Sequence, residues 1–418
     1  MRALPETGGN VLSELGARRI AWADEHMPIL GRLVKERAPQ APLRGQRVGM
    51  ALHLEAKTAR LALALQSLGA EVAIAGSNPL STQDAVARAL AEQGVTVHAR
   101  HGANADEYFG YLDAVLAHKP TLVIDDGGDL LTRLHLRQPQ LLENVRGAAE
   151  ETTTGLVRLR AMHGEGALRV PVIAVNDAQM KRLFDNRFGT GQSVVEALMG
   201  STNLTIAGRY ALVVGFGQCG RGVAQRLRGL GARVGVVDID PVRMNEAWLD
   251  GYEVGAMAEL VPKADIVVTV TGALHVVRKE HFEQMRDGVL LANAGHFDVE
   301  IDKNALREVC GEPEQARENV ERYTAPDGRR FYLLGEGRLV NLAAGDGHPA
   351  EIMDLSFAVQ ALALLHLTEE RMAPGVHAFP EALDQDVARL SLQARGISLE
   401  QETAEQARYR ASWHEGTA

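Results

Sequence analysis

A glycine-rich turn between an apolar run and a helical pattern constrains the fold of this chain most. Apolar residues at 210–214 lead into Gly215, Gly217 and Gly220, spaced G-x-G-x-x-G, and a helical pattern follows. We expect Gly215 to allow a tight turn, Gly217 to let the backbone approach a pyrophosphate, and Gly220 to let helix and strand pack closely. The anion would then lie at the helix N-terminus. The stretch therefore predicts a strand, a turn and a helix that bind a dinucleotide.

An acid at the end of the next predicted strand indicates which dinucleotide. The strand Arg233–Val237 ends in Asp238, about 20 residues after the turn, where a carboxylate accepts hydrogen bonds from a ribose diol. An acid at this position repels a 2′-phosphate, so the pattern favours NAD over NADP. The alternative is a glycine-rich turn that binds no ligand, but it leaves the acid unexplained.

Composition excludes several classes of protein. The chain has 418 residues, of which 46% are apolar and 23% charged, as in a soluble globular protein with two or more domains. A net charge of −10 disfavours nucleic acid or an anionic membrane as partner. Cys219 and Cys310 are the only cysteines, so we expect no disulfide framework and a cytoplasmic location. We expect neither a membrane helix nor a secretory signal.

Ahead of the glycine-rich turn, strand and helix patterns alternate. Strands are expected at 47–52, 71–75, 95–99, 121–124 and 170–175, and helices at 15–35, 55–68, 82–93 and 104–117. After the turn, strands are expected at 265–270 and 288–292, and a helix at 351–367 can return to the first domain. Such alternation predicts parallel sheets with helices on both faces.

Polar side chains follow several of these strands, where open α/β sheets bind their ligands. Any one of them could be a satisfied loop residue, but their joint placement at one rim predicts a polar site. A histidine ends a strand of the second domain in the same way, although a lone histidine can also be a satisfied core residue. The strand-end residues are His53, Ser77, Asn78, Asp125, Asp126, Asp129, Asn176, Asp177 and His296, and Lys181, Asp185 and Asn186 follow shortly after.

Five longer motifs resemble the S-adenosylhomocysteine hydrolase (adenosylhomocysteinase) family. They are DDGGD at 125–129, EETTTG at 150–155, KRLFDN at 181–186, GHFDVEID at 295–302 and GEGRLVNL at 335–342. The likeness runs from about Ala17 to Trp413. It implies an α/β fold of two doubly wound, Rossmann-like parallel-sheet domains and a short C-terminal tail.

The resemblance also implies how the chain is divided and assembled. Residues 1–185 and 349–385 would form a substrate-binding domain, and residues 186–348 an NAD-binding domain, with hinges near Asn186 and Asn341. Residues 386–418 would form a tail that packs on a neighbouring subunit of a homotetramer. Each subunit would hold one NAD tightly.

The reaction implied is the reversible hydrolysis of the thioether of an S-nucleosyl-homocysteine. Oxidation of the 3′-hydroxyl acidifies the C4′ proton, homocysteine leaves, water adds, and the ketone is reduced again, so NAD is regenerated in each turnover. By resemblance, Lys181 takes the 3′-hydroxyl proton, with a pKa that we expect burial and the nicotinamide cation to lower. The other candidate catalytic residues are Asp126 as the base at C4′, His53 as the acid–base group near C5′, Glu151 and Asp185 on the ribose diol, and His296 lining the site.

The remaining candidate residues are those expected to bind ligands. The substrate-binding candidates are Glu55, Lys57, Thr58, His348, Met353 and Phe357. The cofactor-binding candidates are Thr152, Thr153, Thr154, Asn186, Gly215, Gly217, Gln218, Cys219, Gly220, Asp238, Thr271, Asn293, Gly295 and Asn341. We expect no metal ion and no partner other than the substrate and further copies of the chain.

Three positions depart from the family pattern. These departures are at Thr190, in the C-terminal tail and in the segment after His53. Thr190 replaces a cysteine that many members carry, and the chain lacks the terminal Lys and Tyr tail that other members use to cover a neighbouring subunit's NAD, so we expect a differently sealed cofactor. In the segment after His53, Glu55 and Lys57 stand where adenosyl-specific members carry Thr and Glu. Those two side chains read the purine edge.

The exchange at Glu55 and Lys57 reverses the hydrogen-bonding pattern offered to the base. A carboxylate only accepts and an ammonium only donates, so the pair matches hypoxanthine, which donates at N1 and accepts at O6. We therefore favour S-inosylhomocysteine as substrate, with S-adenosylhomocysteine as the alternative if the pair forms a local ion pair or turns outward. An ordinary NAD-dependent dehydrogenase and a catalytically silent regulatory homologue are the more distant alternatives.

Overall fold

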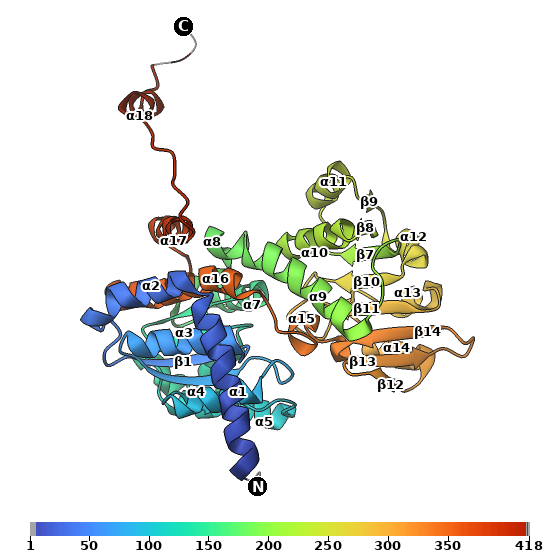
Figure 1. Ribbon diagram of the computed structural model, residues 1–418, viewed down its shortest axis with the longest axis horizontal. Coiled ribbons are helices and arrows are strands. Elements are labelled where there is room, and N and C mark those ends of the chain that lie inside the picture. Colours follow the sequence, from blue (N-terminus) through green and yellow to red (C-terminus); the bar gives the residue numbers. More distant parts are fainter. Residues whose placement is uncertain (1–5, 415, 417–418) are drawn as a thin grey trace.

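Two β-sheets, each covered by helices, organise the chain (Figure 1). The computed structural model describes residues 6–414 and 416, so residues 1–5, 415, 417 and 418 of the predicted domain ranges lie outside it. One sheet has seven strands in the order β15-β6-β5-β4-β1-β2-β3. The other has eight, in the order β12-β13-β14-β11-β10-β7-β8-β9.

The seven-stranded sheet is parallel throughout. Its inner strands are buried on both faces, as is usual in parallel sheets, whereas the edge strands β3 and β15 are only partly buried. Most of the strands lie where the sequence predicts them. The strands β5 and β15 were not predicted, because each is only four residues long and β5 is rich in alanine rather than β-branched residues. The strands are β1 (Arg47–Leu52), β2 (Glu71–Gly76), β3 (Thr96–His98), β4 (Leu122–Asp125), β5 (Gly147–Glu150), β6 (Pro171–Ala174) and β15 (Gly375–Ala378).

One predicted helix of this sheet is divided in the structure, and α6, α7, α8 and α17 were not given by the prediction. The single helix expected at 15–35 is wrong, since the structure has two helices separated at His26 and Met27. Pro28 begins the second helix, where its missing N–H costs nothing, whereas it would break a continuous helix. The helices are α1 (Glu6–Glu25), α2 (Pro28–Arg37), α3 (Ala56–Ser67), α4 (Asp84–Glu92), α5 (Ala105–Ala117), α6 (Asp129–Arg137), α7 (Thr153–Gly164), α8 (Gln179–Arg182), α16 (Ala350–Glu369) and α17 (Glu381–Ala394).

The long helix α16 returns from the second sheet into the core of the first, as the sequence predicts. The carboxylate of Asp354 accepts hydrogen bonds from the backbone N–H groups of Ile29 and Leu30, both at 2.8 Å, which ties α16 to the first turn of α2. By length and mean hydropathy alone α16 is apolar enough to cross a membrane, but 78% of its apolar window is buried inside the protein. Its apolar character is therefore explained by its place in the core.

The eight-stranded sheet contains the predicted dinucleotide-binding strands and an extension that was not predicted. β13 runs antiparallel to both β12 and β14 at one edge. β12 and β13 are too polar to be recognised as buried strands, whereas β14 is largely apolar and buried. The sheet is built from β7 (Tyr210–Val214), β8 (Arg233–Val237), β9 (Glu253–Val254), β10 (Ile266–Thr269), β11 (Val289–Asn293), β12 (Glu314–Arg317), β13 (Val320–Thr324) and β14 (Arg330–Leu334). Its helices are α9 (Thr190–Thr202), α10 (Gln218–Gly229), α11 (Pro241–Leu249), α12 (Met257–Leu260), α13 (Lys279–Gln284), α14 (Lys303–Cys310) and α15 (Val340–Ala343).

The chain crosses between the two sheets twice. It leaves the first sheet through a π-helix at Asp185–Gly189 that leads into α9, and it returns after α15 into α16 (Figure 1). The last helix, α18 (Ala404–Ala411), extends away from the two sheets. Both crossings border the cavity described next.

Candidate active site

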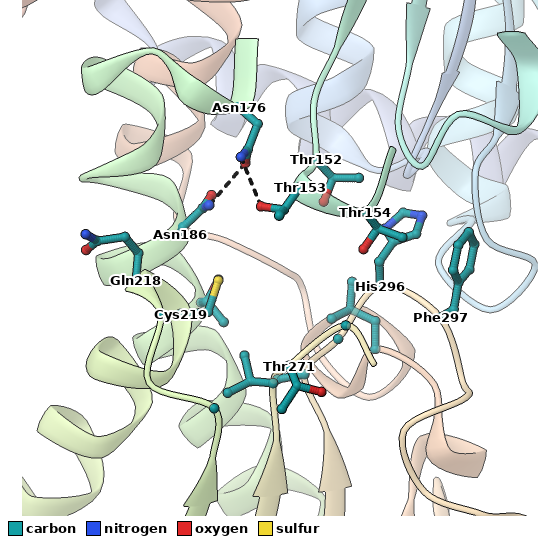
Figure 2. Close-up of a pocket in the computed structure, with 18 of the residues that line it drawn as sticks. Thr152, Thr153, Thr154, Asn176, Asn186, Gln218, Cys219, Thr271, His296 and Phe297 are labelled. Atoms are coloured by element: carbon teal, nitrogen blue, oxygen red, sulfur yellow. Dashed lines mark hydrogen bonds between the residues drawn. The ribbon is translucent and has the colours of Figure 1, made fainter. Parts of the chain in front are cut away.

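A cavity of about 1060 Å³ lies between the two sheets, at the carboxyl ends of their strands. Its lining comes from residues after β1, β4, β5 and β6 on one side and after β7, β8, β10 and β11 on the other. Thr152, Thr153 and Thr154 approach it from the first sheet, and Cys219 and Thr271 from the second (Figure 2). Its size lies at the upper end of the range for small-molecule and cofactor sites.

The glycine-rich turn has the geometry that a dinucleotide requires. Gly215 has φ 106°, a left-handed conformation that favours glycine. A Cβ on Gly220 would collide with the carbonyl oxygen of Gly215, so α10 can start this close to β7 only with glycine there. Gly217 is the N-cap residue of α10 and lines the cavity. The first turn of α10 therefore points free N–H groups at the cavity.

Two further residues fit an adenosine ribose and a nicotinamide. The carboxylate of Asp238 accepts the N–H of Phe216 at 2.6 Å, which fixes the acid at the end of β8 beside the turn. Asn341 is buried, its amide donates to Ser193 at 3.0 Å, and its Oδ1 has no hydrogen-bond partner among the described residues. An orphaned buried acceptor is costly unless a ligand donates to it. These residues fit NAD.

Two predicted cofactor contacts do not line the cavity. Gly220 acts through packing against Gly215. Asn293 is fully buried and holds the loop that follows β11, because its Nδ2 donates to the carbonyls of Phe297 at 2.8 Å and Gly337 at 2.9 Å. All the other residues predicted to be catalytic, substrate-binding or cofactor-binding line the cavity. Of the strand-end residues of the predicted polar rim, Ser77, Asn78, Asp125 and Asp129 do not.

Lys181 lies on α8, just before the π-helix of the first crossing, and its ammonium group belongs to a polar network. Its Nζ donates to Asn186 Oδ1 at 2.8 Å and to Asn176 Oδ1 at 3.2 Å. It also lies 3.5 Å from Glu151 Oε1 and 3.6 Å from Asp185 Oδ2. Figure 2 shows the Asn176 and Asn186 side chains joined beside the cavity. One ammonium group therefore faces two carboxylates that also face the cavity.

The expectation that burial lowers the pKa of Lys181 is wrong for the protein alone. Burial acts in that direction, but Asp185 and Glu151 outweigh it and raise the pKa of Lys181 above its usual range. Burial, together with the Asp185 charge, raises the pKa of Glu151 to about 8, although Lys181 opposes the shift. Lys181 is thus held as an ammonium until additional positive charge is bound nearby.

Asp126 lies between two histidines, one from each sheet. Its carboxylate is 3.2 Å from His53 Nε2 and 3.6 Å from His296 Nδ1. Burial lowers the pKa of His53 to about 4, so this imidazole is neutral at physiological pH. Its Nδ1 lies 2.7 Å from Ser81 Oγ, which donates its own hydrogen to Asn78 O, so Nδ1 carries the proton. Nε2, which lies 3.2 Å from the Asp126 carboxylate, then carries no proton and can accept one.

The same three side chains are close enough together to be considered as metal ligands as well as an acid–base centre. The ligand atoms of His53, Asp126 and His296 lie within 4.8 Å of one another. No local pattern indicated a metal here, because these residues are far apart along the chain and in two sheets. An acid–base role explains their arrangement without a metal.

Glu55, two residues after His53, also lines the cavity and caps helix α3. Its carboxylate accepts the N–H groups of Lys57 at 3.0 Å and Thr58 at 3.1 Å. Lys57 Nζ lies 2.6 Å from Glu55 Oε2 and donates to the carbonyl of Asp346, also at 2.6 Å. The local ion pair considered from the sequence is therefore present, but neither side chain turns outward, since both are buried and line the cavity.

Two residues that position the site were missed in the sequence. Ser356 donates to Asp185 Oδ2 at 2.7 Å, and Gln360 Nε2 donates to Glu151 Oε2 at 2.5 Å. Both lie on α16, one helical turn apart, on the face that also carries the predicted Met353 and Phe357. A serine and a glutamine at i and i+4 within an otherwise apolar helix were the available signal.

The glycine-rich turn and the acid–base groups facing it across one cavity define an NAD-dependent α/β enzyme. The family model described as "S-adenosyl-L-homocysteine hydrolase, NAD binding domain" matches residues 186–347, and the one described as "S-adenosyl-L-homocysteine hydrolase" matches residues 10–140. The chain belongs to the S-adenosyl-L-homocysteine hydrolase family. It is an NAD-dependent hydrolase of the thioether in an S-nucleosyl-homocysteine.

Relatives of known activity are similar over nearly the whole chain. The S-inosyl-L-homocysteine hydrolase of Methanopyrus kandleri is 54% identical, over 97% of this chain and 96% of its own length. The adenosylhomocysteinase of Pyrococcus abyssi is 50% identical, over 97% of both chains. A dipicolinate synthase structure from Bacillus halodurans is 14% identical with a TM-score of 0.51, covers 79% of this chain and all of its own, and shares the fold.

Proposed function

We propose that this enzyme hydrolyses S-inosyl-L-homocysteine in preference to S-adenosyl-L-homocysteine. The observation that carries the proposal is the buried Glu55–Lys57 pair in the cavity wall. The names of the relatives do not decide between the two substrates, because proteins with either name are similar to this chain at comparable identity.

The pair retains the hydrogen-bonding capacity that a 6-oxo purine needs. An ammonium has three donors, and Lys57 uses two of them on Glu55 and on Asp346 O. One donor is left for O6 of hypoxanthine. The Glu55 carboxylate has about four lone-pair sites, and it accepts from two backbone N–H groups, from Lys57 and, in a long contact of 3.4 Å, from the Thr58 hydroxyl. The N1–H of hypoxanthine would take the site of this long hydroxyl contact.

Adenine in the same orientation would oppose both groups. Its unprotonated N1 would face the Glu55 carboxylate, and its N6 amino group would face the Lys57 ammonium. Buried groups left unpaired in this way cost about 1–3 kcal/mol each, and more when they are charged. Sites built to hydrogen-bond one substrate discriminate strongly against an analogue that lacks the matching groups.

The test is kcat/KM for the two nucleosyl-homocysteines on the same preparation of enzyme. We expect a higher value for the inosyl compound, mainly through KM. A higher value for the adenosyl compound would refute the proposed preference. That result would leave the thioether hydrolysis itself unaffected.

The acid–base groups support the following division of roles. When bound, NAD would oxidise C3′ of the ribose and restore it at the end of the turnover. Lys181 takes the 3′-hydroxyl proton, and the added positive charge of the nicotinamide opposes the effect of the neighbouring carboxylates on its pKa. Glu151 and Asp185, fixed by Gln360 and Ser356, hold the ribose diol.

We assign the later steps of the reaction to Asp126 and His53. Asp126 removes the C4′ proton, since its carboxylate is held between two imidazoles without a direct cation contact from lysine or arginine among the described residues. His53, neutral and with Nε2 free to accept, exchanges a proton with the leaving sulfur and with the incoming water. His296 lines the cavity from the side of the second sheet.

We also propose the division, assembly and location of the enzyme. The substrate-binding domain would comprise residues 1–185 and 349–385 and the NAD-binding domain 186–348. The expected tail, 386–418, would begin only after α17, because the boundary at 385 falls inside this helix and Val387 is buried in the core of the first sheet. The tail exposes Tyr409 and Trp413, which are 55% and 86% accessible, away from the two sheets. Exposed aromatic groups of this kind favour burial against a neighbouring subunit of a homotetramer. Both cysteines are unpaired, as expected in the cytoplasm.

A truncation tests the assembly separately from the chemistry. A chain that ends after Gly396 should form a smaller oligomer than the full chain, as measured by light scattering, and should retain NAD less well. A truncated chain that remains a tetramer would show that the tail does not hold the subunits together.

A further inference from the structure

A buried carboxyl group that does not line the cavity joins two loops of the site. Glu150 is the last residue of β5 and is fully buried. Its Oε1 accepts the N–H of Gly127 at 2.9 Å and the N–H of Thr152 at 3.0 Å. Glu150 does not line the cavity. One oxygen atom therefore connects the loop after β4 to the loop after β5.

Each of these loops carries residues that the reaction needs. The first contains Asp126, and its Gly127 packs so closely on His296 that a Cβ there would collide with the imidazole. The second contains Glu151 and leads into the threonines 152–154 beside the cofactor. A shift of either loop would move an acid–base group relative to the ribose.

The surroundings of Glu150 are built to fit its carboxyl group. The backbone of Gly155, in the first turn of α7, packs directly against it, and a Cβ on Gly155 would collide with the carboxyl atoms. Asp125 pairs with Glu150 in adjacent strands and receives its own hydrogen bonds from the N–H groups of Asp126 and Leu131. Neighbouring carboxyls on β4 and β5 thus each support the start of the loop after β4.

We propose that Glu150 is a positioning residue, which fixes the Asp126 loop and the Thr152 loop relative to each other through the hydrogen bonds that its Oε1 accepts. It acts on the substrate only through these loops. The proposal rests on the site proposed for the reaction, but it concerns a residue outside that site.

The charge of this carboxyl group is a second part of its role. Burial, the Asp125 charge and the Asp126 charge raise the pKa of Glu150 well above its usual range. Its Oε2 has no hydrogen-bond partner among the described residues, and an ionised carboxylate there would lack compensation. A neutral carboxyl group supplies the same acceptor to the two loops without adding negative charge beside Asp126. A glutamine side chain would do the same.

The experiment compares Glu150→Gln with Glu150→Met in the NAD-loaded enzyme. Glutamine keeps the acceptor and the neutral charge, whereas methionine fills the space without an acceptor. We expect Glu150→Gln to keep kcat, KM and the pH profile of the wild type. We expect Glu150→Met to lose kcat by about 10²-fold, the scale of a displacement of about 1 Å in an active site, with little change in KM. Glu71→Met, at an exposed position that opens β2, is the control.

Two further readouts separate positioning from chemistry. Exchange of the C4′ hydrogen with deuterated solvent should slow in Glu150→Met but not in Glu150→Gln, and crystal structures should show the two loops displaced only in the former. NAD content and thermal unfolding report whether each variant is loaded and folded. If Glu150→Met does not fold, Glu150→Gln still tests the proposal, because a loss of activity in this variant would refute it.

Two outcomes would overturn the proposal. If Glu150→Gln loses as much activity as Glu150→Met, the carboxyl group has a chemical role that an amide cannot fill. If Glu150→Met keeps full activity and C4′ exchange, the two hydrogen bonds do not position the loops. Either result would leave the purine preference and the thioether hydrolysis untouched, because those are measured on the wild-type enzyme.

Discussion

Lys57 Nζ lies 2.6 Å from a carboxylate oxygen of Glu55, and the same ammonium group donates to the carbonyl of Asp346 in the segment that returns to the first sheet. The pair therefore contacts both the start of α3 and the second crossing between the sheets. The pair therefore stabilises the fold as well as lining the cavity, since Glu55 caps α3. A substitution that tests substrate choice must keep the cap.

The double variant Glu55→Thr/Lys57→Glu meets this condition. Threonine is a good N-cap residue, and glutamate in the first turn of a helix is favoured by the helix dipole, so α3 should stay folded. The variant has the pattern that adenosyl-specific members carry, and we expect its ratio of kcat/KM values to shift toward the adenosyl compound by at least about tenfold. An unchanged ratio in a folded variant would mean that other groups read the base.

The substitution Lys181→Ala should stop the oxidation of the 3′-hydroxyl. The described residues place no other amine beside Glu151 and Asp185, so the loss should be at least the 10²–10⁴-fold that is roughly typical of general acid–base catalysis. The measurement is the transient absorbance of reduced nicotinamide on mixing with substrate. Lys279→Ala, at an exposed lysine, should behave as the wild type.

The raised pKa of Lys181 leads to a related expectation about pH. Because its neighbouring carboxylates favour the ammonium form, the fraction of free amine, and with it the rate of oxidation, should increase as pH rises. Lys181→Arg keeps the positive charge but does not release its proton in proteins, so it should stay slow at every pH. Normal oxidation by this variant would exclude Lys181 as the proton acceptor.

The glycine-rich turn and its acid could be predicted from the sequence itself, because their function depends on local backbone geometry. Gly215 and Gly217 are needed by the turn itself, and Asp238 lies at a fixed distance along the chain. The acid–base half was placed mainly through family resemblance. His53, Asp126 and His296 come from β1, β4 and β11, and nothing in their local sequence states that they meet.

The residues that escaped prediction act through long-range contacts. Gln360 reaches Glu151 and Ser356 reaches Asp185 from a helix that begins more than 160 residues later in the chain. Likewise the strand β5 pairs with β4 and β6 in the interior of its sheet, where alanine suffices because helices cover both faces. The raised pKa of Lys181 also depends on this packing, so the sequence suggested the opposite direction.

The substitution Asp126→Asn should separate oxidation from elimination. The base at C4′ acts after the 3′-hydroxyl has been oxidised, and asparagine keeps the size of the side chain but cannot accept the proton as a carboxylate does. We expect reduced cofactor and 3′-keto substrate to accumulate, with little release of homocysteine. Full turnover without accumulation would place the base elsewhere. Asp106→Asn, in an exposed first turn of α5, is the matched control.

The last prediction concerns the close approach of α10 to β7. A Cβ on Gly220 would overlap the carbonyl oxygen of Gly215, which is backbone and cannot move aside, whereas a Cβ on Gly229, at the end of the same helix, meets nothing within 4 Å. We expect Gly220→Ala to destabilise the protein by about 1–3 kcal/mol, as overpacking does, and to weaken NAD retention because the helix N-terminus withdraws from the pyrophosphate. Gly229→Ala should be neutral or stabilise by up to about 1 kcal/mol, since alanine favours the helix. Thermal unfolding of both variants, with the NAD content measured after gel filtration, checks the pair. If Gly220→Ala kept both its melting temperature and its NAD, the turn would not need the close contact between Gly215 and Gly220.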